Sequence, residues 1–305
     1  MKKYDRMHLL AERKFLQERL AELPNSANIT RISTESRLRA IENNLEQEPD
    51  DEREPARVCL TFNGRPVIGS YGIFAEFGMK AISTFTDAVV ALAASLSTPL
   101  AAMGPIRNRE QHQLLITNTA LGSFGFELEE FPVGQLPLKE ASPVAQALER
   151  TLNLLESTVG TDDQLADSAA DADPRALDKV RTFLQTLADH EAICTMQYQE
   201  RCFRFTDVGQ VRNSLVRLRH DNLREGEQNL EGEFQGILPK LRTFEFKLDS
   251  QDEVVRGKLG PSIQDADVLN THLHQTARIK VMVTRVGNGQ PRYVLIESPE
   301  WFPKT

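Results

Sequence analysis

The feature that most constrains the fold is a regular alternation of apolar and polar residues in the last third of the chain. In the run 243–248, Phe244, Phe246 and Leu248 fall on one side of an extended chain, and the charged residues between them fall on the other. Successive side chains of a β-strand point to opposite faces, so this pattern predicts a strand with one buried face. The run 277–286 alternates in the same way and predicts a second such strand.

Five strand-like runs and one helical run follow one another in this region, in the order 234–238, 243–248, 254–259, the helical run 265–273, 277–286 and 292–297. Three strands, a helix and two strands form an order that resembles the OB-type barrel, a small five-stranded barrel. The resemblance covers about a third of the chain and implies a small C-terminal barrel. An SH3-like barrel or an α+β sandwich would give a similar pattern.

The N-terminal segment predicts a helical hairpin. Leu9, Leu16, Leu20 and Leu23 form a narrow apolar stripe, and a second amphipathic run follows the break after Leu23. Two helices with narrow stripes bury little surface by themselves, so we expect these leucines to mediate self-association.

The middle of the chain predicts strands that alternate with long helices. The strand Val58–Phe62 is followed by Asn63-Gly64, a turn that would return the chain at Val67, and 74–96 reads as a long helix. Two further strands (113–117 and 121–128) and two further helices (140–158 and 174–190) follow, and the acidic run 160–173 between the helices reads as a flexible loop. The predicted fold is therefore α+β, with four segments: a helical hairpin at 1–48, an antiparallel-sheet/helix unit at 55–135, a helical connector at 140–192, and an OB-like barrel with a preceding basic helix at 193–305.

The chain carries no recognisable catalytic or cofactor motif. Phosphate-binding glycine loops are missing from the sequence. His190, Cys194 and Cys202 are the nearest approach to a zinc site, but a fourth ligand is lacking and Cys194 reads as a core thiol. The glycines of 122–126 read as packing positions. We therefore predict no catalytic residue, no cofactor and no metal.

Charge is distributed unevenly along the chain. The net charge is −8, yet residues 201–305 carry 16 Lys and Arg against 14 Asp and Glu, while residues 1–200 carry 20 against 30. The acidic majority argues against indiscriminate phosphate binding, and a basic C-terminal surface remains compatible with it.

Two kinds of residue are candidates for contact with a partner. The run 211–224 reads as a basic helix, and the barrel offers aromatic side chains; together these are Arg212, Arg217, Arg219, Arg224, Phe234 and Tyr293.

The leading functional hypothesis is a non-catalytic adaptor that binds a partner protein through its β modules and forms homo-oligomers through its N-terminal helices. A nucleic-acid-binding accessory protein is the first alternative, and a hydrolase or nuclease with dispersed residues is the second. We expect a cytoplasmic protein without membrane contact. The number of cysteines is odd, the N-terminus is charged, and the apolar run at 88–96 is too short for a membrane span.

Overall fold

The structure of the chain is a computed structural model that describes residues 3–24, 28–46, 55–120, 124–131, 141–249 and 253–302. The chain forms two compact units. One contains the N-terminal helices, and the other contains Ala56–Phe131 together with the chain from Ala141 onward.

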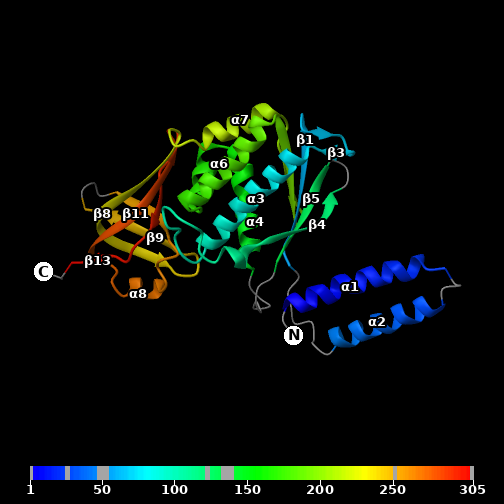
Figure 1. Cartoon of the computed structure of the whole chain (residues 1–305). Helices are drawn as coiled ribbons and strands as arrows, with labels where there is room; N and C mark the ends of the chain where they lie inside the picture. The colour runs from blue at the N-terminus through cyan, green and yellow to red at the C-terminus, as the bar shows by residue number, and fades with distance from the viewer. Residues whose placement is uncertain are drawn as a thin grey trace. The chain divides into compact units, whose positions relative to one another are not determined.

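The first unit is a hairpin of two antiparallel helices, α1 (Lys3–Glu22) and α2 (Asn28–Glu46) (Figure 1). Arg37 of α2 donates two hydrogen bonds to the Glu12 carboxylate of α1, at 2.8 and 3.1 Å, and Ile41 is buried. The predicted stripe of Leu9, Leu16, Leu20 and Leu23 is half-buried. The hairpin alone therefore leaves part of its apolar surface uncovered.

The second unit is built on a five-stranded antiparallel sheet in the order β4-β5-β1-β6-β7. Its strands are β1 (Arg57–Gly64), β4 (Leu114–Ala120), β5 (Phe124–Glu130), β6 (Ala192–Tyr198) and β7 (Arg201–Arg204). Val58, Leu60 and Phe62 alternate along the central strand β1 and are almost wholly buried. One face of the sheet therefore packs against a hydrophobic core.

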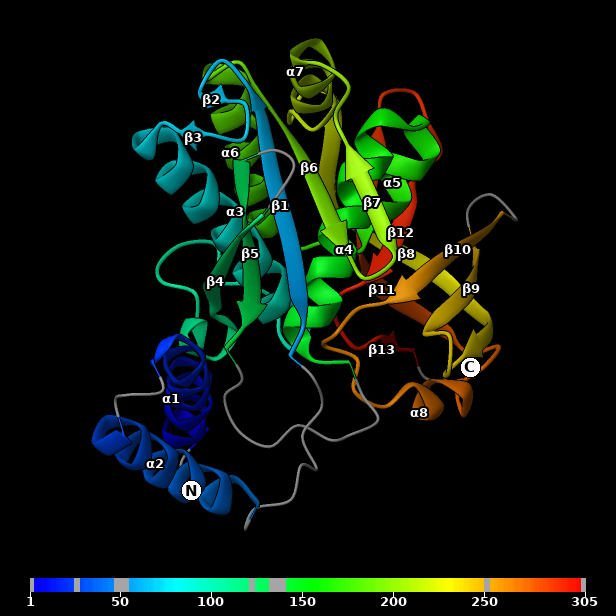
Figure 2. The same cartoon turned by 90° about the vertical axis from the view of Figure 1, so that its right-hand side faces the viewer.

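Helices cover that face (Figures 1 and 2). They are α3 (Ala75–Ser95), α4 (Pro143–Val159), α5 (Asp162–Ala170), α6 (Pro174–Asp189) and α7 (Val208–Arg217). Proline occupies the first turn of α4 and of α6, where its missing N–H costs nothing. α3 is long and apolar enough to cross a membrane, but 61% of its most apolar window is buried inside the protein, as in the core helix of a soluble protein.

Three details of this unit differ from the sequence-based prediction. The residues Val67–Ile68 (β2) do not return along β1; they pair with β3 (Gly72–Ile73), because β5 and β6 occupy both edges of β1. The run 160–173 is not a loop, since a Thr161–Gln164 capping box starts α5 within it. The strands β6 and β7 belong to this sheet, not to the C-terminal barrel.

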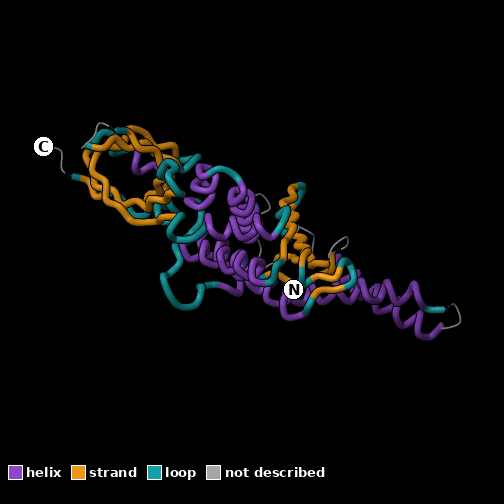
Figure 3. The backbone as a smooth tube through the Cα atoms, turned by 90° about the horizontal axis from the view of Figure 1, so that it is seen from above, coloured by secondary structure: helices purple, strands orange, loops and turns teal. Residues whose placement is uncertain are grey.

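The C-terminal part of the second unit is a closed five-stranded barrel, as the sequence predicts. Its elements are β8 (Leu223–Leu238), β9 (Thr243–Leu248), β10 (Val254–Leu259), α8 (Ala266–Asn270), β11 (Thr276–Val286) and β12 (Arg292–Leu295), with β13 (Glu300–Trp301) added beyond β11. The strands follow the order β8-β9-β10-β12-β11, and β11 pairs back onto β8 to close the ring seen in Figure 3. β10 and β12 are parallel. With the helix between its third and fourth strands, the barrel is OB-like.

The barrel has a hydrophobic core of its own, separate from the core beneath the first sheet. Phe244 and Phe246 are buried in it, as predicted, and Phe234 packs against Phe246 with ring centroids 4.9 Å apart. Leu223 at the start of β8 and Val286 at the end of β11 are instead buried in the core of the helical layer. These two strand ends join the barrel to the rest of the unit.

Candidate binding site on the barrel

A groove of about 730 Å³ is lined by strands of the barrel and by the helix α5. Its apolar lining residues include Ile237, Leu238, Phe244, Leu273, Tyr293 and Val294. Leu238 and the neighbouring Leu241 of the β8–β9 connection are 57% and 71% exposed. The groove is therefore an accessible, largely apolar depression.

Two glycines shape the groove. Gly257 of β10 lies so close to its neighbours that a Cβ there would come within 2.5 Å of the Phe244 ring and 2.7 Å of the Tyr293 carbonyl oxygen. Gly236 of β8 also lines the groove, but it has open space beside it: a Cβ there would meet no atom within 4 Å. The first glycine permits close packing of the strands, and the second leaves open space.

Three cations line the groove, and each is paired with a carboxylate of the same chain. Arg256 of β10 contacts Glu245 of β9 at 2.9 Å. Lys258 of β10 contacts Asp171 at 2.6 Å, and Arg292 of β12 contacts Asp167 at 2.5 Å and Asp163 at 3.3 Å. Leu259 and Leu295 are buried in the barrel core. Lys258 lies one residue before Leu259 and Arg292 three residues before Leu295, so strand alternation places both cations on the outer face of the barrel.

We call these ion pairs the ionic seam: Lys258 with Asp171, and Arg292 with Asp163 and Asp167. Asp163 and Asp167 belong to α5, and Asp171 is the residue that follows its last turn. The partial exposure of these side chains, between 27% and 59%, leaves the seam accessible to water.

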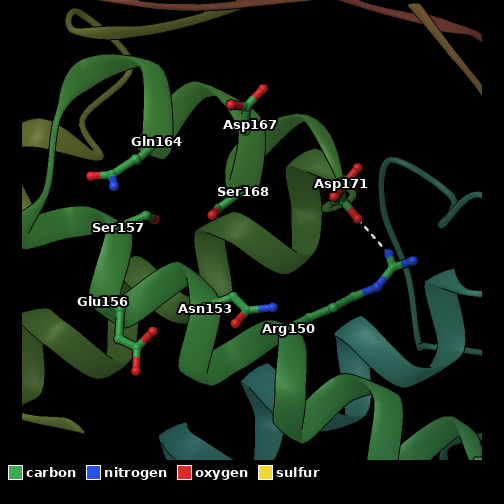
Figure 4. Close-up of a pocket in the computed structure, with 8 residues that line it drawn as sticks. All are labelled: Arg150, Asn153, Glu156, Ser157, Gln164, Asp167, Ser168 and Asp171. Atoms are coloured by element: carbon green, nitrogen blue, oxygen red, sulfur yellow. Dashed lines mark hydrogen bonds between the residues drawn. The ribbon is translucent and has the colours of Figure 1, made fainter.

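A second pocket, of about 360 Å³, lies between α4 and α5 (Figure 4). Its lining is polar, and its charged side chains already have partners: Arg150 donates to the Asp171 carbonyl oxygen at 2.5 Å, and Glu156 accepts from Arg201 at 2.6 Å. Asp167 and Asp171 line this pocket as well as taking part in the ionic seam. Arg150 thus joins α4 to the end of α5, and Arg201 of β7 joins Glu156 of α4.

The basic residues predicted from the sequence do not share one helix. α7 ends at Arg217, whose guanidinium donates to the carbonyl oxygens of Thr158 and Gly160 and to the Asp162 carboxylate, and thereby fastens α7 to the start of α5. Arg219 lies in the turn that follows, and Arg224 lies on β8. Arg212 is exposed on α7 near Glu191.

Of the two predicted aromatic residues, only Tyr293 lines the groove. Tyr293 is half-buried, and burial raises the pKa of its hydroxyl. Phe234 is wholly buried and offers no stacking surface. Arg256, Lys258 and Arg292 were not among the predicted site residues. The alternation of β10, with Val255 and Leu259 buried, nevertheless assigns its two cations to the outer face.

A charged cluster with two largely buried members, Arg181 and Glu225, lies at the start of β8. Arg181 of α6 approaches the Glu225 carboxylate at 3.8 Å and the Asp178 carboxylate at 2.5 Å, and His220 lies 3.3 Å from Asp178. The side chain of Glu225 is only 11% exposed. Burial raises the pKa of Glu225 to about 7.

The described residues contain no group of three or more His, Cys, Asp or Glu side chains placed to hold a metal ion. His190 lies 2.8 Å from the Thr186 carbonyl oxygen through Nδ1, Cys194 is buried, and Cys202 is exposed. Burial strongly raises the pKa of the Cys194 thiol, as expected of a thiol in a hydrophobic core.

A second exposed apolar surface lies at the start of α3. Ile68, Tyr71, Phe74 and Met79 are 58%, 90%, 60% and 70% exposed within a stretch that includes the β2–β3 hairpin. Large apolar side chains gathered in this way mark surfaces that contact other molecules.

Comparison of the chain with protein-family models, with curated proteins and with solved structures finds no match.

Proposed function

We propose that this protein is a non-catalytic adaptor that holds an extended segment of a partner protein in the barrel groove. The observation that carries the proposal is the groove itself, about 730 Å³ in volume and lined mainly by apolar side chains, with exposed leucines beside it. Specific recognition sites are typically concave and mainly apolar, with a few polar groups that fix orientation. The strands of the OB-like barrel and the helix α5 supply such a site.

A strand of nucleic acid is the second candidate occupant. The OB-like strand order and the outward-facing cations Arg256, Lys258 and Arg292 favour it. Binding of single-stranded nucleic acid also requires exposed aromatic rings on which bases stack. Phe244 lines the groove but is buried, Tyr293 is half-buried, and Phe234 is buried away from the groove, so the lining offers few free ring faces and favours a protein segment.

The proposal is tested by filling the groove. Gly236→Trp places a large ring where a Cβ meets no atom within 4 Å, so it blocks the groove with little strain on the fold. A photo-crosslinking residue at the exposed Leu238, introduced in the cells of origin, identifies the partner, and titration calorimetry then measures its affinity. We expect Gly236→Trp to weaken binding at least about tenfold, since filling the site removes roughly 1.4 kcal/mol or more.

Ile116→Trp is the matched control, because Ile116 is 58% exposed on β4 of the other sheet. Equal affinities of the two variants would contradict the groove as the site. The nucleic-acid alternative predicts instead that the chain binds a fluorescent oligo-dT and loses affinity steeply as salt is raised.

Assembly through the N-terminal hairpin completes the proposed function. Phe15 and Ile32 are 56% and 66% exposed, and the leucine stripe is only half-buried, so a second copy of the hairpin would cover apolar surface that the isolated hairpin leaves in water. We further propose that the protein acts in the cytoplasm, where its free cysteines would stay reduced.

A further inference from the structure

The helix α5 presents two faces of opposite character. Leu165, Ala166 and Ala169 are fully buried in the core beneath the first sheet. Asp163, Asp167 and Asp171 recur every four residues and therefore share another face, directed at the barrel. The helix is thus fixed to the helical layer by its apolar face, and its carboxylates are held out toward the barrel cations.

The contact between this acidic face and the barrel is ionic. The barrel has a separate hydrophobic core, and the pairs of Lys258 and Arg292 with α5 are partly open to solvent. Ion pairs of this kind contribute little net free energy, because water solvates the separated charges well. A carboxylate from another molecule can therefore replace Asp167 or Asp171 at little cost.

The seam borders the groove that the proposed function assigns to a partner. Asp167 and Ala170 of α5 line the groove opposite β10 and β12, so an occupant of the groove lies beside Lys258 and Arg292. Arg256, the third cation, is 82% exposed and is matched by Glu245 from the adjacent strand. Each of the three groove cations thus meets a carboxylate of the chain itself.

We propose that α5 is an internal substitute for the partner: its carboxylates hold Lys258 and Arg292 until a partner segment that carries acidic residues beside apolar ones displaces them. The inference rests on the proposed function and names the chemistry of the segment. Apolar side chains of the segment enter the groove, and its carboxylates take over the cations of the seam. The acidic face of α5 then opposes binding of any ligand that lacks carboxylates to exchange.

The experiment removes the internal competitor in the full-length protein. Asp163→Asn, Asp167→Asn and Asp171→Asn are combined in a seam variant, and the exposed residues Glu76, Glu110 and Glu149 are changed to Gln in a control with the same change of net charge. The probe is a fluorescent ten-residue peptide of alternating Leu and Glu, and its binding is followed by fluorescence anisotropy. A peptide of alternating Leu and Lys and an oligo-dT of fifteen nucleotides serve as comparison probes.

We expect the seam variant to bind the Leu-Glu peptide up to roughly tenfold more tightly than the wild type, because the small contributions of three competing ion pairs add up when all three are removed. The charge-matched control should bind as the wild type does. Adding Lys258→Ala and Arg292→Ala to the seam variant should abolish the gain, which assigns it to those cations.

Equal affinities of the seam variant and the charge-matched control would overturn the inference. A gain for oligo-dT alone would also overturn it and would identify the groove as a nucleic-acid site. The proposed function is tested by a separate variant: it is wrong if Gly236→Trp still binds the captured partner with the affinity of the wild type. The two conclusions are therefore tested by different variants and different ligands.

Discussion

Replacing Phe246 by alanine tests whether the barrel depends on a core of its own. Phe246 is wholly buried, and its ring meets Phe234 edge to face at 4.9 Å and 74°. The substitution leaves a cavity in a small core, in which the described part of the barrel has twelve buried residues and little freedom to collapse around the cavity. Loss of a buried phenylalanine from such a core costs about 3–5 kcal/mol, of which the aromatic pair contributes about 0.5–1.5 kcal/mol.

Urea unfolding followed by tryptophan fluorescence measures the effect in the barrel itself. Trp301 is the single tryptophan of the chain, and its ring stacks on His272 at 4.5 Å and lies 5.7 Å from Phe234. Its emission therefore reports on barrel packing. With a denaturant slope of about 2 kcal/mol per molar urea, we expect the midpoint to fall by roughly 2 M.

Val254→Ala is the control for this measurement. Val254 is 46% exposed at the start of β10, so its truncation should change stability by less than about 0.5 kcal/mol. A Phe246→Ala midpoint no lower than that of the control would refute the separate barrel core.

Three further predictions concern other parts of the chain. Burial raises the pKa of Glu225 to about 7, so the folded state retains a proton that the unfolded chain releases near pH 4.5. The free energy of unfolding should therefore fall as the pH rises from about 4.5 to about 7. Between pH 5.5 and pH 8 the fall amounts to about 2 kcal/mol, because about 1.5 pH units of that interval lie below the folded pKa. Glu225→Gln should remove it in urea titrations at the two pH values, and parallel profiles for the two proteins would contradict the assignment. Gly125→Ala should cost about 1–3 kcal/mol in thermal unfolding, because its Cβ would lie 2.2 Å from the β1 backbone, whereas Gly226→Ala, with no atom within 4 Å, should cost much less. Light scattering should find the full chain oligomeric and a variant with Leu16→Asp and Leu20→Asp monomeric; a monomeric wild type at micromolar concentration would count against the hairpin as the assembly element.

The sequence predicts the barrel well because strand alternation is a local property. Phe244 and Phe246 repeat with period two, and both are buried as expected. The interpretation of Phe234 as an accessible residue fails for an equally physical reason. The register of β8 against β9 shifts between Phe234 and Gly236, and such a bulge changes which side chains point inward.

The groove was not predictable from local pattern. Arg292 and Asp167 lie 125 positions apart, and no short-range periodicity connects them. The helix α5 was predictable in principle, because Thr161 and Gln164 have the spacing of a capping box. Its buried face consists of Leu165 and two alanines, too small an apolar stripe to distinguish a helix from a polar loop by composition.

The parallel pairing of β10 with β12 has a consequence for the synthesis of the protein. β12 is the last strand to complete the ring, and it bridges β10 and β11, which lie earlier in the chain. Until Arg292–Leu295 has left the ribosome, the facing edges of β10 and β11 carry unpaired backbone groups. Premature termination just before β12 would therefore produce a chain with two open strand edges, which is a substrate for aggregation and for quality-control proteases.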